Sequence, residues 1–318
     1  MTLVTFSRGY SILMGKKTKI GLAAVAVGAA AWAGSKALAT PQTRPGKDVL
    51  DYGHPIVLAH RGGGAIAPEN TMAAFRKSAE LGVHGFEIDI RLSKDEEILV
   101  FHDEYLDRTT DGAGRVADMT LKELSEFDLG YHFVDPSGKT TYRGKGEKIV
   151  LLRDLLEAFP QMFINIDMKD SPETYEGSLI PSKLWRLIDS LGVHDRVVVT
   201  SFYDEQIDRF NLYAQNRVAI GAGENEVKKA YTAFNSQFGH LYNPRADVFQ
   251  IPVRSSMFRL DLPRFIAFLA NLNIPVHYWT IDDPEVMKGL LAAGAQGIIT
   301  GRPDLAVALI SEMEDQTQ

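Results

Sequence analysis

The sequence H-R-G-G-G-A-I-A-P-E-N-T (residues 60–71), followed by G-F-E-I-D-I (85–90) and I-L-V-F-H-D (98–103), decides how the fold of this chain is interpreted. The apolar run 56–59 leads into the first segment, and a short apolar run that ends in glycines is typical of a buried parallel strand. Ionisable side chains end or interrupt each apolar run, although unpaired buried charge is costly. The pattern therefore indicates an active site at the carboxyl ends of parallel strands, built around a metal ion.

Carboxylates at strand spacing are the first sign of a metal. Glu87 and Asp89 are two residues apart on an expected strand, so their side chains share one face. Neighbouring carboxylates repel each other unless a cation neutralises them, and oxygen ligands suit Mg²⁺ or Ca²⁺. Asp167, in F-I-N-I-D-M-K (163–169), is a third candidate ligand. The alternative is a solvated polar face on an edge strand.

Two histidines end apolar runs, which suggests acid–base chemistry. Histidine as a residue type suits proton transfer in both directions, so His60 and His102 are candidates for a general acid and a general base. One such histidine alone would more often be structural. Lys169 alternates with apolar residues and shares the face of Asp167, where it could bind a phosphate oxygen. Asn70 or Thr71 could instead simply cap a helix that starts near residue 70.

Together these motifs resemble the glycerophosphodiester phosphodiesterase family over roughly residues 56–309. Weaker matches lie at I-D-M-K (166–169), V-V-V-T-S-F (197–202), Y-W-T-I-D (278–282) and G-I-I-T-G-R-P-D (297–304). The resemblance implies an α/β barrel that hydrolyses a phosphodiester with a divalent metal. It implies that acid–base catalysis falls to His60 and His102, the metal to Glu87, Asp89 and Asp167, phosphate binding to Arg61 and Lys169, and further substrate contacts to Glu69, Asn70 and Trp279.

The chain departs from the family pattern at two positions. Asp167 stands where the family more often has Glu, so its reach is shorter and it could bind a metal through water. Gly301 stands where many members have an acidic or amide residue. Trp279 could shape the leaving-group pocket or serve only in packing.

Alternating apolar runs and helical patterns predict a somewhat irregular TIM-type (β/α)8 barrel over residues 56–310, with a tail at 311–318. Only the short segment 93–97 separates the second and third expected strands, too few residues for a parallel crossover. These two strands must therefore form a hairpin, or one lies outside the barrel pattern. The expected strands are 56–60, 85–91, 98–101, 162–168, 196–201, 217–221, 247–251, 275–280 and 296–300, and the expected helices are 70–81, 151–159, 181–190, 204–215, 225–236, 261–272 and 283–293.

A polar insertion, residues 104–148, follows the third expected strand. Segments of this length are usually functional or mobile. We expect this one to lie over the site because it begins directly after His102. Its aromatic and apolar residues could line an apolar entrance, or they could pack the insertion onto the barrel. These residues are Phe127, Leu129, Tyr131, Phe133 and Tyr142.

The first 40 residues have the layout of a secretory signal or a membrane anchor. Three lysines at positions 16, 17 and 19 precede the apolar run 20–34, and Ala37-Leu38-Ala39 follows it. Both interpretations predict export, with the barrel anchored by a single N-terminal segment or periplasmic or extracellular after the signal is removed. We expect 20–34 to contact nothing in the barrel and 41–55 to be a linker. The alternative is a buried or amphipathic helix of a soluble protein.

The charge balance bears on the substrate. Residues 1–40 carry five Lys or Arg and no Asp or Glu, so the remainder carries 29 basic and 41 acidic residues, a formal balance of −12. Such a body argues against nucleic acid, which is bound by clustered positive charge. The absence of cysteine excludes disulfides and thiolate sites.

The leading hypothesis is therefore hydrolysis of small glycerophosphodiesters to an alcohol and glycerol 3-phosphate. The alternatives are lysophospholipase D-type hydrolysis of lysophospholipids and a non-catalytic phospholipid-binding barrel. Sphingomyelinase-type chemistry is disfavoured by the P-E-N-T segment.

Overall fold

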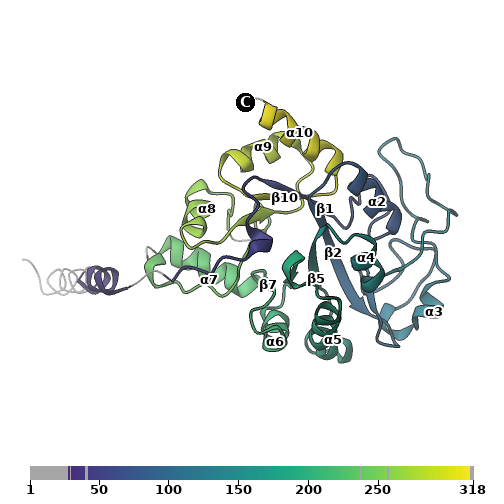
Figure 1. Ribbon diagram of the computed structural model, residues 1–318, viewed down its shortest axis with the longest axis horizontal. Helices are drawn as coiled ribbons and strands as arrows, with labels where there is room; N and C mark the ends of the chain where they lie inside the picture. The colour runs from purple at the N-terminus through teal and green to yellow at the C-terminus, as the bar shows by residue number, and fades with distance from the viewer. Residues whose placement is uncertain (1–27, 29, 40–41, 237, 256–257, 316–318) are drawn as a thin grey trace, which may run out of the picture.

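A computed structural model describes residues 28, 30–39, 42–236, 238–255 and 258–315. In this part of the chain, strands and helices alternate, and the helices surround a central sheet (Figure 1). The strands are β1 (Ile56–His60), β2 (Gly85–Leu92), β3 (Ile98–Val100), β4 (Val150–Leu151), β5 (Phe163–Met168), β6 (Val197–Thr200), β7 (Ala219–Ile220), β8 (Phe249–Ile251), β9 (Val276–Tyr278) and β10 (Gly297–Thr300). The α-helices are α2 (Met72–Glu80), α3 (Leu121–Leu124), α4 (Leu152–Ala158), α5 (Tyr175–Leu191), α6 (Asp204–Ala214), α7 (Glu224–Asn235), α8 (Pro263–Ala270), α9 (Pro284–Ala292) and α10 (Pro303–Asp315).

The parallel strands close into a barrel. Their order is β7-β6-β5-β2-β1-β10-β9-β8, and a parallel bridge between Gly221 and Val248 joins the two ends of that row. With β3 and β4 set aside, each strand therefore neighbours the next one along the chain, and a helix follows each of them. This arrangement is a (β/α)8 barrel, as the sequence predicted.

β3 and β4 lie outside the barrel. β3 pairs antiparallel with the end of β2, with Ile90 opposite Val100, and β4 pairs antiparallel with β3. The short separation allowed a hairpin or a strand outside the barrel pattern, and the structure shows both, since β3 forms a hairpin with β2 and lies off the barrel. The two-residue strand β4 and the four-residue helix α3 carried too little periodicity to be predicted.

One helix extends well beyond its predicted bounds, and another was not predicted. α5 begins at Tyr175 because the Thr174 side chain accepts a hydrogen bond from the Gly177 amide and caps the helix; Pro181 lies inside it. α10 was not predicted and runs to Asp315. The expected tail at 311–318 is therefore helical over 311–315.

Strand alternation directs polar side chains into the barrel. On β2, the Phe86, Ile88 and Ile90 side chains are fully buried in the main apolar core, which lies between the sheet and its helices. Glu87 and Asp89 alternate with them and face the barrel interior. The same alternation on β5 places Asp167 inside the barrel and Ile166 outside.

The insertion packs beside the barrel rather than over its mouth (Figure 1). Its Leu106, Val116 and Leu124 form a small core with Leu99 of β3 and with Phe101, which directly follows β3. Phe127 and Leu129 belong to this core, and Phe133 meets Tyr142 within the insertion. Of the two alternatives, the packing of the insertion therefore holds for Phe127, Leu129, Phe133 and Tyr142.

Residues 42–55 are a packed part of the barrel rather than a linker. The Arg44 Nε donates to Asp247 Oδ1 at 2.9 Å. Val49, Leu50 and Tyr52 pack against the apolar cluster at the amino ends of the strands, and the Tyr52 ring lies 5.9 Å from that of Phe163. We call residues 42–55 the floor segment.

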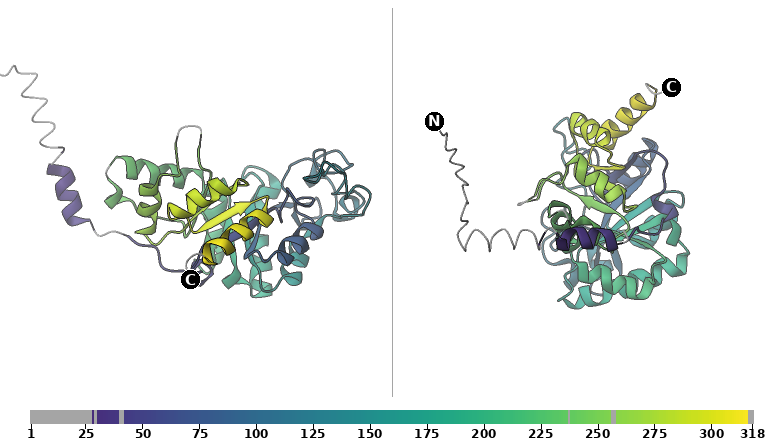
Figure 2. Two further views of the ribbon diagram at one scale, coloured as in Figure 1. Left: turned by 90° about the horizontal axis from the view of Figure 1, so that it is seen from above. Right: turned by 90° about the vertical axis from the view of Figure 1, so that its left-hand side faces the viewer.

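Residues 30–38 are helical and touch the barrel domain. This helix lies at one end of the molecule (Figure 2). Ser35 Oγ lies 2.9 Å from His240 Nε2, and the Trp32 ring stands edge-on to the His240 ring. The expectation that 20–34 contacts nothing in the barrel is therefore wrong at Trp32. Residues 20–27 and 29 lie outside the described part of the chain, and none of the described helices has the length and apolar character to cross a bilayer.

Candidate active site

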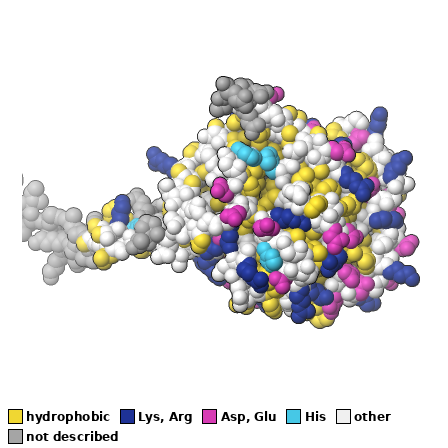
Figure 3. Space-filling view, in the orientation of Figure 1, with side chains coloured by type: hydrophobic (Ala, Val, Ile, Leu, Met, Phe, Trp, Pro, Cys, Tyr) yellow, Lys and Arg dark blue, Asp and Glu magenta, His cyan; other side chains and the backbone are white. Residues whose placement is uncertain are grey.

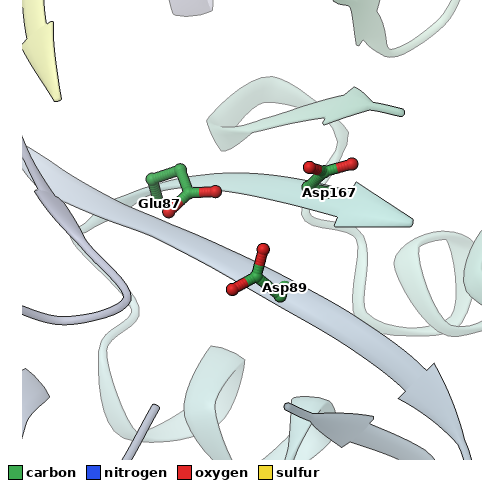
Figure 4. A group of neighbouring side chains, drawn as sticks. All are labelled: Glu87, Asp89 and Asp167. Atoms are coloured by element: carbon green, nitrogen blue, oxygen red, sulfur yellow. The ribbon is translucent and has the colours of Figure 1, made fainter. Parts of the chain in front are cut away.

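Three buried carboxylates meet at the carboxyl ends of β2 and β5. Figure 4 shows Glu87 and Asp89 on β2 and Asp167 on β5. Asp89 and Asp167 are register partners, and one oxygen from each of the three residues lies within 4.8 Å of the others. Asp167 Oδ1 is buried without a hydrogen-bond partner. This oxygen-only set, with one unpaired oxygen, fits a hard divalent cation.

Two cations border the three carboxylates. The Lys169 ammonium lies 3.0 Å from Asp89 Oδ1 and 2.5 Å from Asp167 Oδ2, because Lys169 follows β5 on the same face as Asp167. Arg61 Nε lies 3.1 Å from Asp89 Oδ2. Arg61 has a left-handed backbone with a φ of 52°, which turns the chain inward as β1 ends, and its amide donates to Glu87 Oε2 at 3.2 Å.

The electrostatics of the cluster leave it short of positive charge. Burial raises the pKa of Asp167, and burial together with Asp89 raises the pKa of Glu87. Burial also acts on Asp89, but Lys169 and Arg61 outweigh it and hold the pKa of that carboxyl below its usual range. A bound divalent cation would add the positive charge that keeps all three carboxylates ionised.

The two histidines line the same pocket from different elements. His60 Nε2 lies 3.8 Å from Glu87 Oε2 and 3.5 Å from the Thr280 hydroxyl, and burial lowers the pKa of His60 to about 4. His102 follows β3, and its Nδ1 lies 2.5 Å from Asp103 Oδ1. A histidine whose Nδ1 is engaged by a carboxylate has its Nε2 left for a substrate.

The P-E-N-T segment divides its roles between neighbouring residues. Thr71 is the cap of α2, since its hydroxyl accepts from the Ala74 amide at 3.3 Å. Asn70 has a φ of 57°, and its amide nitrogen lies 3.4 Å from Asp89 Oδ2. Glu69 Oε1 accepts from Arg61 Nη1 at 2.9 Å. The capping alternative therefore holds for Thr71, whereas Asn70 and Glu69 contact the charged cluster.

An apolar wall faces the charged cluster across a cavity of about 320 Å³. Trp279 stands in this wall, where its indole donates to the Gln250 carbonyl at 2.8 Å and its ring meets Phe202 edge-on at 5.7 Å. Of its two proposed roles, Trp279 thus lines the pocket as well as packing. The apolar wall consists of Phe202, Val227, Ile251, Pro252, Phe258, Leu260 and Trp279.

Two residues of the site were given no role from the sequence, although the strand alternation places Asn165 on the same face as Asp167. Asn165 lines the pocket beside Glu87, and its side-chain oxygen is buried without a partner. Arg108 reaches in from the insertion and binds the carboxylates of Glu69 and Asp103. The only local signal for Arg108 was its place in R-T-T-D-G-A-G, six residues after His102.

The surface carries charge of both signs. On the face shown in Figure 3, Lys and Arg side chains are interspersed with Asp and Glu rather than gathered into one basic stripe. This face therefore gives no support to a nucleic-acid partner.

The model of the glycerophosphoryl diester phosphodiesterase family matches residues 60–305. The chain belongs to this family. As a member of the glycerophosphodiester phosphodiesterase family, it is a phosphoric diester hydrolase, as its motifs suggested. The matched range runs from His60 to beyond β10 and so contains the carboxylates, both histidines and the apolar wall.

Several relatives match this chain over most of their own length. A glycerophosphodiester phosphodiesterase of Caldanaerobacter subterraneus is 31% identical over 264 residues, which are 80% of this chain and 97% of the relative. A human lysophospholipase D is 27% identical over 275 residues, which are 77% of this chain and 83% of the relative. The solved structure of an Oleispira antarctica phosphodiesterase, in complex with the product sn-glycerol-3-phosphate, superposes with a TM-score of 0.64 at 24% identity and covers 81% of this chain and 97% of that one.

Proposed function

We propose that this phosphodiesterase hydrolyses glycerophosphodiesters to an alcohol and glycerol 3-phosphate, with Mg²⁺ or Ca²⁺ held by Glu87, Asp89 and Asp167. The observation that carries the proposal is the convergence of three buried carboxylates and two histidines on one pocket. When bound, the cation would polarise a phosphoryl oxygen and offset its charge. The product named for the Oleispira antarctica enzyme fits the same reaction.

The residues of the chain divide the remaining work. Lys169 and Arg61 bind and orient non-bridging phosphate oxygens by charge-assisted hydrogen bonds. One of His60 and His102 accepts a proton from the nucleophile, which is water or a neighbouring substrate hydroxyl, as that nucleophile bonds to phosphorus. As the bond from phosphorus to the leaving oxygen breaks, the other histidine donates its proton to that oxygen. If water is the nucleophile, this one step gives the alcohol and glycerol 3-phosphate. If a substrate hydroxyl is the nucleophile, the step gives a cyclic phosphate, which a second attack by water opens while the two histidines exchange roles. Proton exchange with water then restores both histidines.

Substituting the histidines tests this mechanism. His60→Ala and His102→Ala should each lower kcat on glycerophosphocholine by at least about 10²-fold, the scale of acid–base catalysis, with little loss of folded protein. His194→Ala is the matched control, because His194 pairs with Asp189 on the surface. Turnover near that of the control in either site mutant would remove the histidine from the mechanism.

A second candidate substrate is a lysophospholipid, hydrolysed in the manner of a lysophospholipase D. The apolar wall favours it, because a headgroup alone offers little apolar surface for seven such residues to contact. The human relative is named for this activity. A non-catalytic phospholipid-binding barrel would leave the paired histidines without a role.

We also propose that the enzyme is exported and stays close to a membrane through its N-terminus. The basic cluster at 16–19, the apolar run 20–34 and Ala37-Leu38-Ala39 support this proposal. Protease added to intact cells should digest the barrel domain if it is exported. Protection of the domain in intact cells, with digestion only after lysis, would count against export.

A further inference from the structure

Arg108 joins two carboxylates that the proposed mechanism leaves unexplained. Its Nε and Nη2 donate to the Asp103 carboxylate at 2.5 and 3.2 Å. Its Nη1 and Nη2 donate to the Glu69 carboxylate at 2.8 and 2.6 Å. A guanidinium has five N–H donors, and these contacts use four in two fork-shaped pairs. Arg108 is thus committed to the two carboxylates, although about half of its side chain is exposed.

Each of these carboxylates holds a different site residue. Asp103 Oδ1 binds His102 Nδ1 at 2.5 Å, which fixes the orientation of that imidazole and directs Nε2 elsewhere. Glu69 Oε1 binds Arg61 Nη1 at 2.9 Å, and Arg61 in turn lies against Asp89. A continuous chain of charge-assisted contacts therefore runs from His102 through Arg108 to the three carboxylates.

The contact also joins two separate parts of the fold. Glu69 precedes α2 of the barrel, whereas Asp103 and Arg108 lie where the β3 hairpin passes into the insertion. The hairpin is paired with the barrel along β2, but β3 ends at Val100, before His102 is reached. Arg108 is the side chain that ties the segment after β3 back to the P-E-N-T segment.

We propose that Arg108 is a positioning residue for the phosphodiester reaction, which sets His102 relative to Arg61 without touching the substrate. This inference rests on the proposed roles of His102 and Arg61. Removing Arg108 leaves two neighbouring carboxylates without their shared cation, so both His102 and Arg61 lose their fixed partners. Misplacement of reacting groups by about 1 Å can cost about 10²-fold in rate.

The test compares Arg108→Ala, Arg108→Lys and a control arginine in the same insertion. Arg115→Ala is that control, because Arg115 pairs with Glu104 and Glu176 away from the pocket. kcat, KM and Tm are measured with glycerophosphocholine for each protein. We expect Arg108→Ala to lose about 10- to 100-fold in kcat/KM, most of it in kcat. Arg108→Lys should recover only part, since an ammonium cannot fork to two carboxylates.

Two further measurements separate positioning from mere stability. Guanidinium ion at non-denaturing concentration should restore part of the kcat of Arg108→Ala and leave Arg115→Ala unchanged. The double variant Asp103→Asn with Arg108→Ala should be little slower than the slower single variant, because both act through His102. Multiplicative losses, or kinetics of Arg108→Ala that match Arg115→Ala, would overturn the proposal.

The same experiment distinguishes failure of the inference from failure of the proposed function. An inactive His102→Ala beside a fully active Arg108→Ala would remove only the role of Arg108. An active His102→Ala would remove the acid–base mechanism and the positioning role together. A rise confined to KM, with no guanidinium rescue of kcat, would make Arg108 a direct phosphate contact and would also overturn positioning.

Discussion

Asp89 and Asp167 are register partners on adjacent parallel strands, and the Lys169 ammonium bridges their carboxylates. Like charges at this separation are stable only with positive charge between them. Lys169 and Arg61 supply two positive charges, whereas Glu87 adds a third carboxylate to the same point. This imbalance makes the response to a divalent cation the most direct test of the site.

Metal binding should appear as a gain in thermal stability. Mg²⁺ or Ca²⁺ at about 100 times its Kd would stabilise the native state by about 2.7 kcal/mol. For a domain of about 270 residues, that is a rise in Tm of about 5 °C by thermal scan. Asp167→Asn should lose the rise, and Asp189→Asn, which alters an exposed carboxylate, should keep it. An equal rise in both variants, or full activity in chelator, would contradict the three-carboxylate site.

Changes to the apolar wall should separate the two candidate substrates. Phe258→Ala removes an aromatic ring from the wall without touching the charged cluster, at a cost of about 1.5 kcal/mol to a bound acyl chain. The KM for lysophosphatidylcholine should therefore rise about tenfold, while that for glycerophosphocholine changes little. Tyr213→Ala on the exposed face of α6 serves as the control. Equal effects of Phe258→Ala on both substrates would mean that the apolar wall does not contact an acyl chain.

Acid should destabilise the barrel through His277. This histidine on β9 is fully buried, and burial lowers its pKa to about 3. The unfolded chain binds the proton below about pH 6.5 and the native state does not, so stability falls as pH drops through that range, by about 2 kcal/mol at pH 5. His277→Gln should flatten the slope of Tm between pH 6.5 and 4. An unchanged slope, or the same flattening in a control His132→Gln on the surface, would contradict this assignment.

Truncation should distinguish the N-terminal segment 1–41, called the leader below, from the floor segment. Deleting residues 1–41 should leave a soluble domain with its full rate on glycerophosphodiesters. If the leader is a tether, the truncated enzyme should lose rate mainly on lipid in bilayers, because the effective enzyme concentration there falls.

Deleting residues 1–55 should instead abolish cooperative unfolding or lower Tm sharply. That deletion removes the bond from Arg44 to Asp247 and uncovers the apolar cluster beneath Tyr52. Thermal scans and both assays on the two truncated proteins check this. Loss of soluble activity in the shorter deletion would make the leader part of the catalytic domain.

Local sequence patterns were sufficient where one strand decided the outcome. The period of two on β2 placed Glu87 and Asp89 on one face, and the short separation from β3 excluded a parallel crossover between the two strands. Local patterns were insufficient where segments that are distant in sequence meet. Arg108 binds Glu69 across 39 residues of sequence, and no local pattern encodes that contact. The apolar wall likewise collects residues from loops, from β8 and from α7, and no more than two of them are adjacent in sequence.

The floor segment was misjudged for a related physical reason. Its polar composition resembles a linker, and its few apolar residues matter only because the amino ends of the strands leave an apolar cluster to cover. The opposite case is Asn70, whose sequence allowed a cap. In the structure Thr71 forms the cap instead, and the left-handed backbone at Asn70 directs its side-chain amide toward Asp89.

The β3 hairpin divides the two histidines between different kinds of scaffold. His60 ends a strand of the closed barrel, whereas His102 follows a strand outside it. The span between the two imidazoles therefore depends on how the hairpin is held against β2, where the Phe101 amide donates to the Asp89 carbonyl at 2.9 Å and Arg91 Nε donates to the His102 carbonyl at 2.8 Å. Lengthening or shortening the hairpin would adjust that span while all eight parallel strands keep their register. The fold thus offers evolution, or an engineer, a way to fit bulkier phosphodiesters without rebuilding its core.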